Sequence, residues 1–154
     1  MTRWITDRTD DDVAQVKSLA LKAKAGTWTE EEQAEWAAGM KGALSYMDYN
    51  RIEGGIQEIA GILNASVSIK TDWDVNGYLT ASDASRWLSN IRAIRSLCSG
   101  NNDTPETPAS LNYLHYTVIN QVEEILLDIE TIANNHLIYC SEPVCGGEPY
   151  YALC

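Results

Sequence analysis

The sequence predicts a mainly α protein, a helical bundle of about four to five helices with extended N- and C-terminal arms. Three observations support this prediction. Apolar residues recur at helical spacing in several stretches of the 154-residue chain, and capping and stop residues bracket those stretches. Both ends of the chain lack this periodicity. We therefore expect an N-terminal arm at residues 1–9, a helical bundle at residues 10–137 and an extended C-terminal tail at residues 138–154.

The first helix is expected from about Asp11 to Ala25. Thr9 or Asp10 serves as its N-cap, since either side chain can accept a hydrogen bond from a free amide of the first turn. Gly26 ends the helix, because glycine readily adopts the left-handed conformation that follows a last turn. The predicted apolar stripe of this helix consists of Val13, Val16, Leu19, Ala20 and Ala23.

The second and third helices have different start signals. Thr29 and Glu32 stand at the N-cap and N3 positions of a capping box, which starts a short helix that ends near Gly39. The third helix is expected to start at Asp48, which would serve as its N-cap. Its apolar stripe consists of Ile52, Ile56, Ile59, Ile62 and Leu63.

The second half of the chain alternates polar crossings with two helices. Residues 64–74 are polar and β-branched by turns, which predicts a crossing with one short strand at residues 67–69. A helix is expected over residues 85–98, followed by a linker rich in Gly, Asn and Pro over residues 99–110. The last long helix is expected over residues 116–135. Its inward-facing residues are Val118, Val122, Ile125, Leu126, Ile129 and Ile132.

Three of these helices align at a constant spacing, with residues 50, 85 and 120 in equivalent positions. The same register pairs Asp48 with Asp83, which predicts that both act as N-caps, each worth ~1 kcal/mol. Two interpretations stay open: an internal repeat of stacked helices, or unrelated amphipathic helices that happen to share a register. The equivalent triplets are Asn50, Ser85 and Asn120; Arg51, Arg86 and Gln121; Ile52, Trp87 and Val122; Ile56, Ile91 and Leu126; and Ile59, Ile94 and Ile129.

The stretch DWDVNGYLTASD, residues 72–83, follows the spacing of an EF-hand calcium loop. Its fit is incomplete, because position 12 holds Asp instead of a bidentate Glu and no amphipathic helix precedes the loop. Dockerin modules share both departures, but they carry two such loops. A calcium loop and a structural turn before a helix therefore both stay open. The ligands of the calcium site would be Asp72, Asp74, Asn76, Tyr78 and Asp83.

The charge and the reactive residues favour a protein without nucleic-acid, membrane or catalytic chemistry. A formal net charge of −11 disfavours binding to nucleic acid or to an anionic membrane. The longest apolar runs are far shorter than the ~20 residues of a membrane-spanning helix. His115 and His136 are the only histidines, and no nucleophile with a neighbouring base is evident. We expect no enzyme activity and no cofactor other than the calcium considered above.

The four cysteines fit no strong zinc pattern. Free thiols are expected if the protein stays inside a cell, and disulfides are the alternative if it is exported. The cysteines are Cys98, Cys140, Cys145 and Cys154.

Six motifs occur along the chain: the N-terminal W-x-x-DRT-x-x-DV at Trp4 to Val13, the acidic helix at Glu30 to Trp36, the MKGA link at Met40 to Ala43, the D-x-NR-x-E helix start at Asp48 to Glu53, the K-TDW element at Lys70 to Trp73, and VEEILLDIETI in the last helix. Together these motifs resemble a helical module of virion proteins from phages and prophages of Gram-positive gut bacteria. The resemblance implies a structural tail, baseplate or fibre-associated protein that acts in assembly or host adhesion. It implies synthesis in the host cytoplasm, a place in the virion, other virion proteins as partners and a homo-oligomer in the particle.

The two termini are the expected interaction surfaces, because the helices direct their apolar stripes at one another. Extended, aromatic segments can add to a neighbour's sheet edge or fill its pockets. The predicted contact residues are Trp4, Ile5, Tyr139, Tyr150, Tyr151 and Leu153.

Two alternative functions stay open beside the structural one. A carbohydrate-binding adhesion module would place Trp28, Trp36, Trp73 and Trp87 on one exposed face, where indole rings can stack on sugars. A dockerin-like single-loop calcium module would use the loop at residues 72–83. Burial of the tryptophans separates the first alternative from a structural protein, and calcium titration tests the second.

Overall fold

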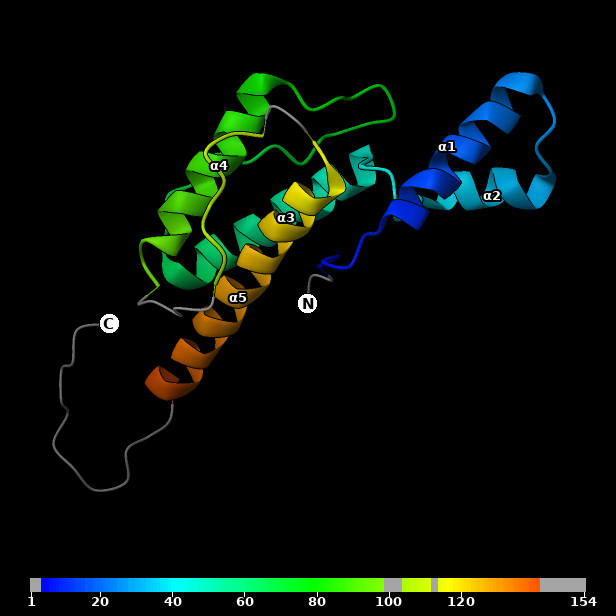
Figure 1. Cartoon of the computed structure of the whole chain (residues 1–154). Helices are drawn as coiled ribbons and strands as arrows, with labels where there is room; N and C mark the ends of the chain where they lie inside the picture. Colours follow the sequence, from blue (N-terminus) through cyan, green and yellow to red (C-terminus); the bar gives the residue numbers. More distant parts are fainter. Residues whose placement is uncertain (1–3, 99–103, 112–113, 142–154) are drawn as a thin grey trace, which may run out of the picture.

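The computed structural model describes residues 4–98, 104–111 and 114–141, with side chains described up to residue 135. Helices dominate this part of the chain, and no strand occurs within it. The mainly α prediction is therefore confirmed. The helices are α1 (Asp10–Ala25), α2 (Glu30–Ala38), α3 (Tyr46–Leu63), α4 (Ala81–Arg95) and α5 (Tyr116–Ser141) (Figure 1).

Helices α3, α4 and α5 pack on one another and form the core of the bundle (Figure 1). Their apolar stripes recur at helical spacing, so each helix presents one continuous apolar face to the other two. Burying each Ile or Leu of this core stabilises the fold by ~1.5–3 kcal/mol. The fully or almost fully buried residues include Ile52, Ile56, Ile59, Trp87, Leu88, Ile91, Ile94, Val122, Ile125, Leu126 and Ile129.

Helices α1 and α2 form a hairpin that extends away from this core (Figure 1). Both predicted start signals are confirmed, because Thr9 and Thr29 each form a capping box with the carboxylate three residues later. Gly26 ends α1 with a φ of 68°, in the left-handed region. The apolar stripe of α1 is buried only at Leu19, and Ala20 is exposed. Two helices that pack mainly on each other cannot bury a full apolar face. This explains why most of the predicted stripe of α1 is not buried.

The predicted N-caps of α3 and α4 are wrong by three residues. Ser45 and Thr80 are the N-caps, and Asp48 and Asp83 stand at N3. Each aspartate accepts hydrogen bonds from the backbone amide and the hydroxyl of its N-cap residue, so the carboxylates complete capping boxes. Burial opposes ionisation of Asp83, but hydrogen bonds from Thr80 and Arg86 outweigh it and lower its pKa below the ordinary value of 3.8.

Two further boundaries differ from the predictions. Residues 67–69 form no strand but part of an extended segment that crosses the bundle, where Asn90 binds both backbone groups of Ser68. Because no neighbouring strand pairs with Ser68, a side chain satisfies the hydrogen bonds of its backbone N–H and C=O. Helix α5 continues to Ser141, so residues 138–141 are helical, whereas the sequence predicts an extended tail from residue 138. Residues 142–154 lie outside the described part of the chain.

Within the described residues, no helix has the length and apolar content needed to cross a membrane.

Candidate functional site

An extended segment is fixed to helix α3 by two side chains of that helix. Asn50 accepts a hydrogen bond from the Trp73 amide (3.1 Å) and donates one to the Trp73 carbonyl (2.9 Å). Glu53, one turn further along, accepts from the amide of Lys70 (3.3 Å). We call Asn50 and Glu53 the α3 clamp, because together they satisfy backbone groups that have no strand partner.

Helix α5 carries an equivalent pair, which we call the α5 clamp. Asn120 accepts from the amide of Arg8 (3.3 Å) and donates to its carbonyl (3.0 Å). Glu123 accepts from the amide of Ile5 (2.6 Å). We call residues 4–8 the N-terminal strap. In both clamps the Asn binds one residue and the Glu binds the amide three residues before it, so the two geometries match.

This match supports the internal-repeat interpretation of the sequence register. Asn50 and Asn120 are equivalent positions, and Glu53 and Glu123 follow each of them by three residues. Helix α4 takes part differently, because Ser85 stands at the position of the Asn. Its Arg86 donates to Glu53, as Arg51 of α3 donates to Glu123. Each clamp therefore receives an arginine from a neighbouring helix.

The α5 clamp lies on a buried network of charges. Glu123 is fully buried and accepts from Arg8 (2.8 Å) and from Arg51 (2.9 Å). Asp48 binds Arg51 at 2.8 Å and Arg8 at 3.5 Å. Two carboxylates thus face two guanidinium groups, which compensates the cost of burying each charge. Burial lowers the pKa of Arg51, but its hydrogen bonds to Glu123 and Asp48 outweigh this effect and raise the pKa above its ordinary value.

Two tryptophans donate to buried glutamates, one of which belongs to the α3 clamp. Trp87 Nε1 donates to Glu53 and Trp4 Nε1 donates to Glu130, each at 2.7 Å. The same Glu53 also accepts from Arg86, whose pKa this hydrogen bond raises against the effect of burial. Buried carboxylates here are held by several donors, as low-dielectric surroundings require.

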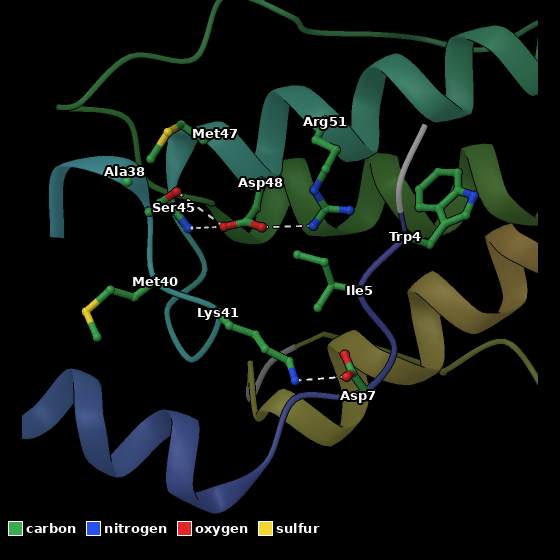
Figure 2. A pocket seen from close by; sticks show the side chains of 11 residues that line it. Trp4, Ile5, Asp7, Ala38, Met40, Lys41, Ser45, Met47, Asp48 and Arg51 are labelled. Carbon is green, nitrogen blue, oxygen red and sulfur yellow. Dashed lines mark hydrogen bonds and ion pairs between the residues drawn. The ribbon is translucent and has the colours of Figure 1, made fainter. Parts of the chain in front are cut away.

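A pocket of about 430 Å³ lies between the N-terminal strap, the link from α2 to α3 and the first turns of α3. Figure 2 shows Ile5 between two ion pairs, Lys41 with Asp7 and Arg51 with Asp48. The hydrogen bond with Lys41 lowers the pKa of Asp7, and the same bond raises that of Lys41. The charged groups of this pocket already bind one another, which suits a structural role better than ligand chemistry.

A second hollow, of about 480 Å³, is lined by the end of α2, the same link, the start of α3 and the loop before α4, and we call it the junction groove. Its lining is mainly apolar and includes two methionines, whose flexible side chains adapt to varied partners. Trp36 and Val75 on its rim are 39% and 79% exposed, and the neighbouring Tyr78 is 74% exposed. The lining residues are Trp36, Ala37, Gly39, Met40, Ala43, Leu44, Ser45, Tyr46, Met47, Val75 and Gly77.

Four of the predicted calcium ligands lie in the loop before α4, and the fifth, Asp83, stands in the first turn of that helix. Asp74 accepts from the amides of Asn76 and Gly77, through its side chain and its carbonyl respectively. Asp83 directs its carboxylate at Thr80 and Arg86. Among the described residues, no group of three or more His, Cys, Asp or Glu could hold a metal ion. The calcium site, with Asp72, Asp74, Asn76, Tyr78 and Asp83 as ligands, stays a prediction.

The predicted interaction residues fall into two groups. Trp4 is 9% exposed and packs in the core of its own chain, and Ile5 is half-buried. The described part of the N-terminal arm, residues 4–8, is therefore bound to its own chain in this structure. Tyr139 belongs to α5, but its side chain is not described, and Tyr150, Tyr151 and Leu153 lie outside the described residues.

The tryptophans proposed for sugar stacking do not share one exposed face. Trp73 and Trp87 are buried, where both pack against Tyr49 with ring centroids 4.9 Å and 6.0 Å apart. Trp28 and Trp36 form a separate edge-to-face pair in the hairpin. This division disfavours a carbohydrate platform made of all four rings.

Sequence reasoning missed the clamps themselves. Glu53 and Glu123 lie inside predicted apolar stretches, and a charged residue at a core position is the signal that could have identified them. The register already pairs Asn50 with Asn120, but their partners come from segments that no periodicity connects to the helices.

Comparisons of the chain with family models, with curated proteins and with solved structures find no match. The resemblance to phage virion proteins therefore stays an expectation drawn from sequence motifs.

Proposed function

We propose that the chain is a structural protein of a tailed-phage virion, associated with the tail, baseplate or fibre, and that it acts by binding other proteins of the particle. The observation that carries the proposal is the junction groove, with Trp36 and Val75 exposed on its apolar rim and Tyr78 exposed beside it in the chain. Aromatic residues and methionine are enriched in protein interfaces, and contiguous exposed apolar surface is a mark of such sites.

The location of the groove adds to this proposal. It lies where the α1–α2 hairpin joins the three-helix core (Figure 1), so a partner would contact both parts at once. The sequence motifs that resemble virion proteins include the acidic helix and the MKGA link, and residues of both line the groove. The phage context comes from that resemblance, and the protein-binding role comes from the surface.

The test is incorporation into particles made by the strain that encodes the chain. Mass spectrometry of gradient-purified particles should detect the wild-type chain at a level comparable with known tail components. Trp36→Lys with Val75→Lys should remove it, because two buried ammonium groups would oppose apolar contact. Leu127→Lys is the matched control, since Leu127 is 40% exposed and lies on α5, outside the groove lining.

The outcomes separate the two parts of the proposal. A wild-type chain that is missing from the particles contradicts the virion assignment. A groove variant that is incorporated as well as the Leu127→Lys control contradicts the role of the groove.

A further inference from the structure

The N-terminal segments of the chain bind one another as a unit, which we call the N-terminal unit and define as residues 4–42. Lys41 Nζ lies 3.0 Å from Asp7 and 3.6 Å from Asp12, and the carbonyl of Lys41 accepts from Arg8 Nε at 3.1 Å. Gly42 lies so close to α1 that a Cβ atom there would be 2.1 Å from the Asp12 carbonyl oxygen. The strap, α1 and the link after α2 are thereby fixed to each other.

The polar contacts between this unit and the bundle are concentrated in the strap. Trp4, Ile5 and Arg8 contribute the hydrogen bonds to α5, and Arg8 also reaches Asp48 of α3. Helices α1 and α2, in contrast, do not pack extensively on α3, α4 or α5. Residues 43–45 form the covalent connection between the N-terminal unit and α3.

The two clamps differ in how their segments are tethered. The α3 clamp binds residues 70–73, which follow the end of α3 at Leu63 after a short stretch, so this segment has no other reachable site. The α5 clamp binds residues 5–8, which lie 112 residues or more away in sequence. No local connection forces those residues onto the α5 of their own chain.

We propose that the α5 clamp is a homotypic binding site that accepts the N-terminal unit of a second copy of this chain, with residues 43–45 as the hinge. Every hydrogen bond and ion pair of the strap forms identically in the exchanged dimer, and only the hinge differs, which is why such exchange is a low-cost route to dimers. The inference does not depend on the proposed virion role.

Charge sets the conditions under which exchange is expected. At a net charge of −11 two copies repel one another, and salt screens that repulsion. The dimer should therefore increase with protein concentration and with ionic strength. An association that relied on surface ion pairs would weaken with salt instead.

Complementation between two full-length variants tests the proposal. The first variant, Trp4→Ala with Arg8→Ala, has a defective strap and an intact clamp. The second variant, Asn120→Ala with Glu123→Gln, has an intact strap and a defective clamp. The two variants are mixed at high concentration in 0.5 M salt, where the Debye screening length is about 4 Å. They should form a 1:1 heterodimer in native mass spectrometry, because only the mixture contains both an intact strap and an intact clamp.

If the strap variant or the clamp variant loses its helical circular dichroism, a change in hinge length tests the same proposal. Deleting Ala43 and Leu44 from the hinge shortens the connection by about 7 Å, so the strap should no longer reach its own α5 and a dimer should become the main species. Inserting Gly-Ser-Gly-Ser after Ala43 is the control and should favour the monomer. A monomeric deletion variant, or a mixture of well-folded variants that forms no heterodimer, would overturn the proposal.

Discussion

Replacing Glu123 with alanine should be among the most damaging single substitutions in this chain. The carboxylate is fully buried and accepts from the Ile5 amide at 2.6 Å, from Arg8 at 2.8 Å and from Arg51 at 2.9 Å. Without it the Arg8 guanidinium, whose side chain is only 3% exposed, keeps a more distant carboxylate at 3.5 Å. The substitution therefore leaves a buried charge poorly compensated.

The expected cost is about 3–5 kcal/mol, the range for breaking a buried ion pair on one side. That cost is a large fraction of the ~5–15 kcal/mol that stabilises a typical domain. Glu53→Ala should cost less, because its partner Arg86 is 19% exposed and keeps Asp83 at 3.2 Å. Glu123→Ala should therefore lose more stability than Glu53→Ala, because the arginine that it leaves behind is less exposed to water.

Urea unfolding followed by circular dichroism measures both losses. The double variant Arg8→Met with Glu123→Leu should recover part of the loss, since an apolar pair of similar volume often replaces a buried ion pair without cost. A loss below about 1 kcal/mol for Glu123→Ala, the range of an exposed ion pair, would show that the network is not buried as described. Equal losses for Glu123→Ala and Glu53→Ala would refute the argument from exposure.

Three further predictions follow from individual positions. Gly54→Ala should stabilise the chain by ~0.5–1 kcal/mol, because a Cβ atom there meets no atom within 4 Å. Gly42→Ala should destabilise it by ~1–3 kcal/mol, because its Cβ atom would collide with the Asp12 backbone. Thermal unfolding measures both changes. The lowered pKa of Asp83 means that its contribution to stability is present above about pH 4 and is lost as the pH falls through the folded pKa, so Asp83→Asn should reduce the fall in melting temperature between about pH 7 and pH 3. Burial raises the pKa of Cys98, so in a variant with serine at the other three cysteines it should react with a thiol reagent at about pH 8 more slowly than a free cysteine; an equal rate would contradict its half-buried position.

The helical fold could be predicted from the sequence because its signals are local. The stripe from Ile52 to Ile59 repeats at helical spacing, and Thr9 and Thr29 carry capping boxes within four residues. The starts of α3 and α4 were misplaced for a specific reason. Aspartate is favoured both at N-cap and at N3, and the sequence alone does not distinguish these positions when a serine or threonine stands three residues earlier.

The candidate sites could be predicted only in part because their partners are distant in sequence. Asn120 and Arg8 meet across 112 residues, and no periodicity relates them. The strap was expected to bind other chains because Trp4 and Ile5 are apolar residues in a segment without helical pattern. The structure places Trp4 against Glu130 of its own α5, which only the three-dimensional path of the chain reveals.

The central claim is that two equivalent clamps hold two extended segments, and amide hydrogen exchange tests it most directly. The amides of Ile5, Arg8, Lys70 and Trp73 each donate to a clamp side chain, while the structure gives the amide of Thr6 no acceptor within the described part of the chain. We expect the four clamped amides to be protected and the Thr6 amide of the strap to exchange much faster. Fast exchange at Ile5 and Arg8, with protection retained at Lys70 and Trp73, would contradict the α5 clamp. Fast exchange at all four would contradict the account as a whole.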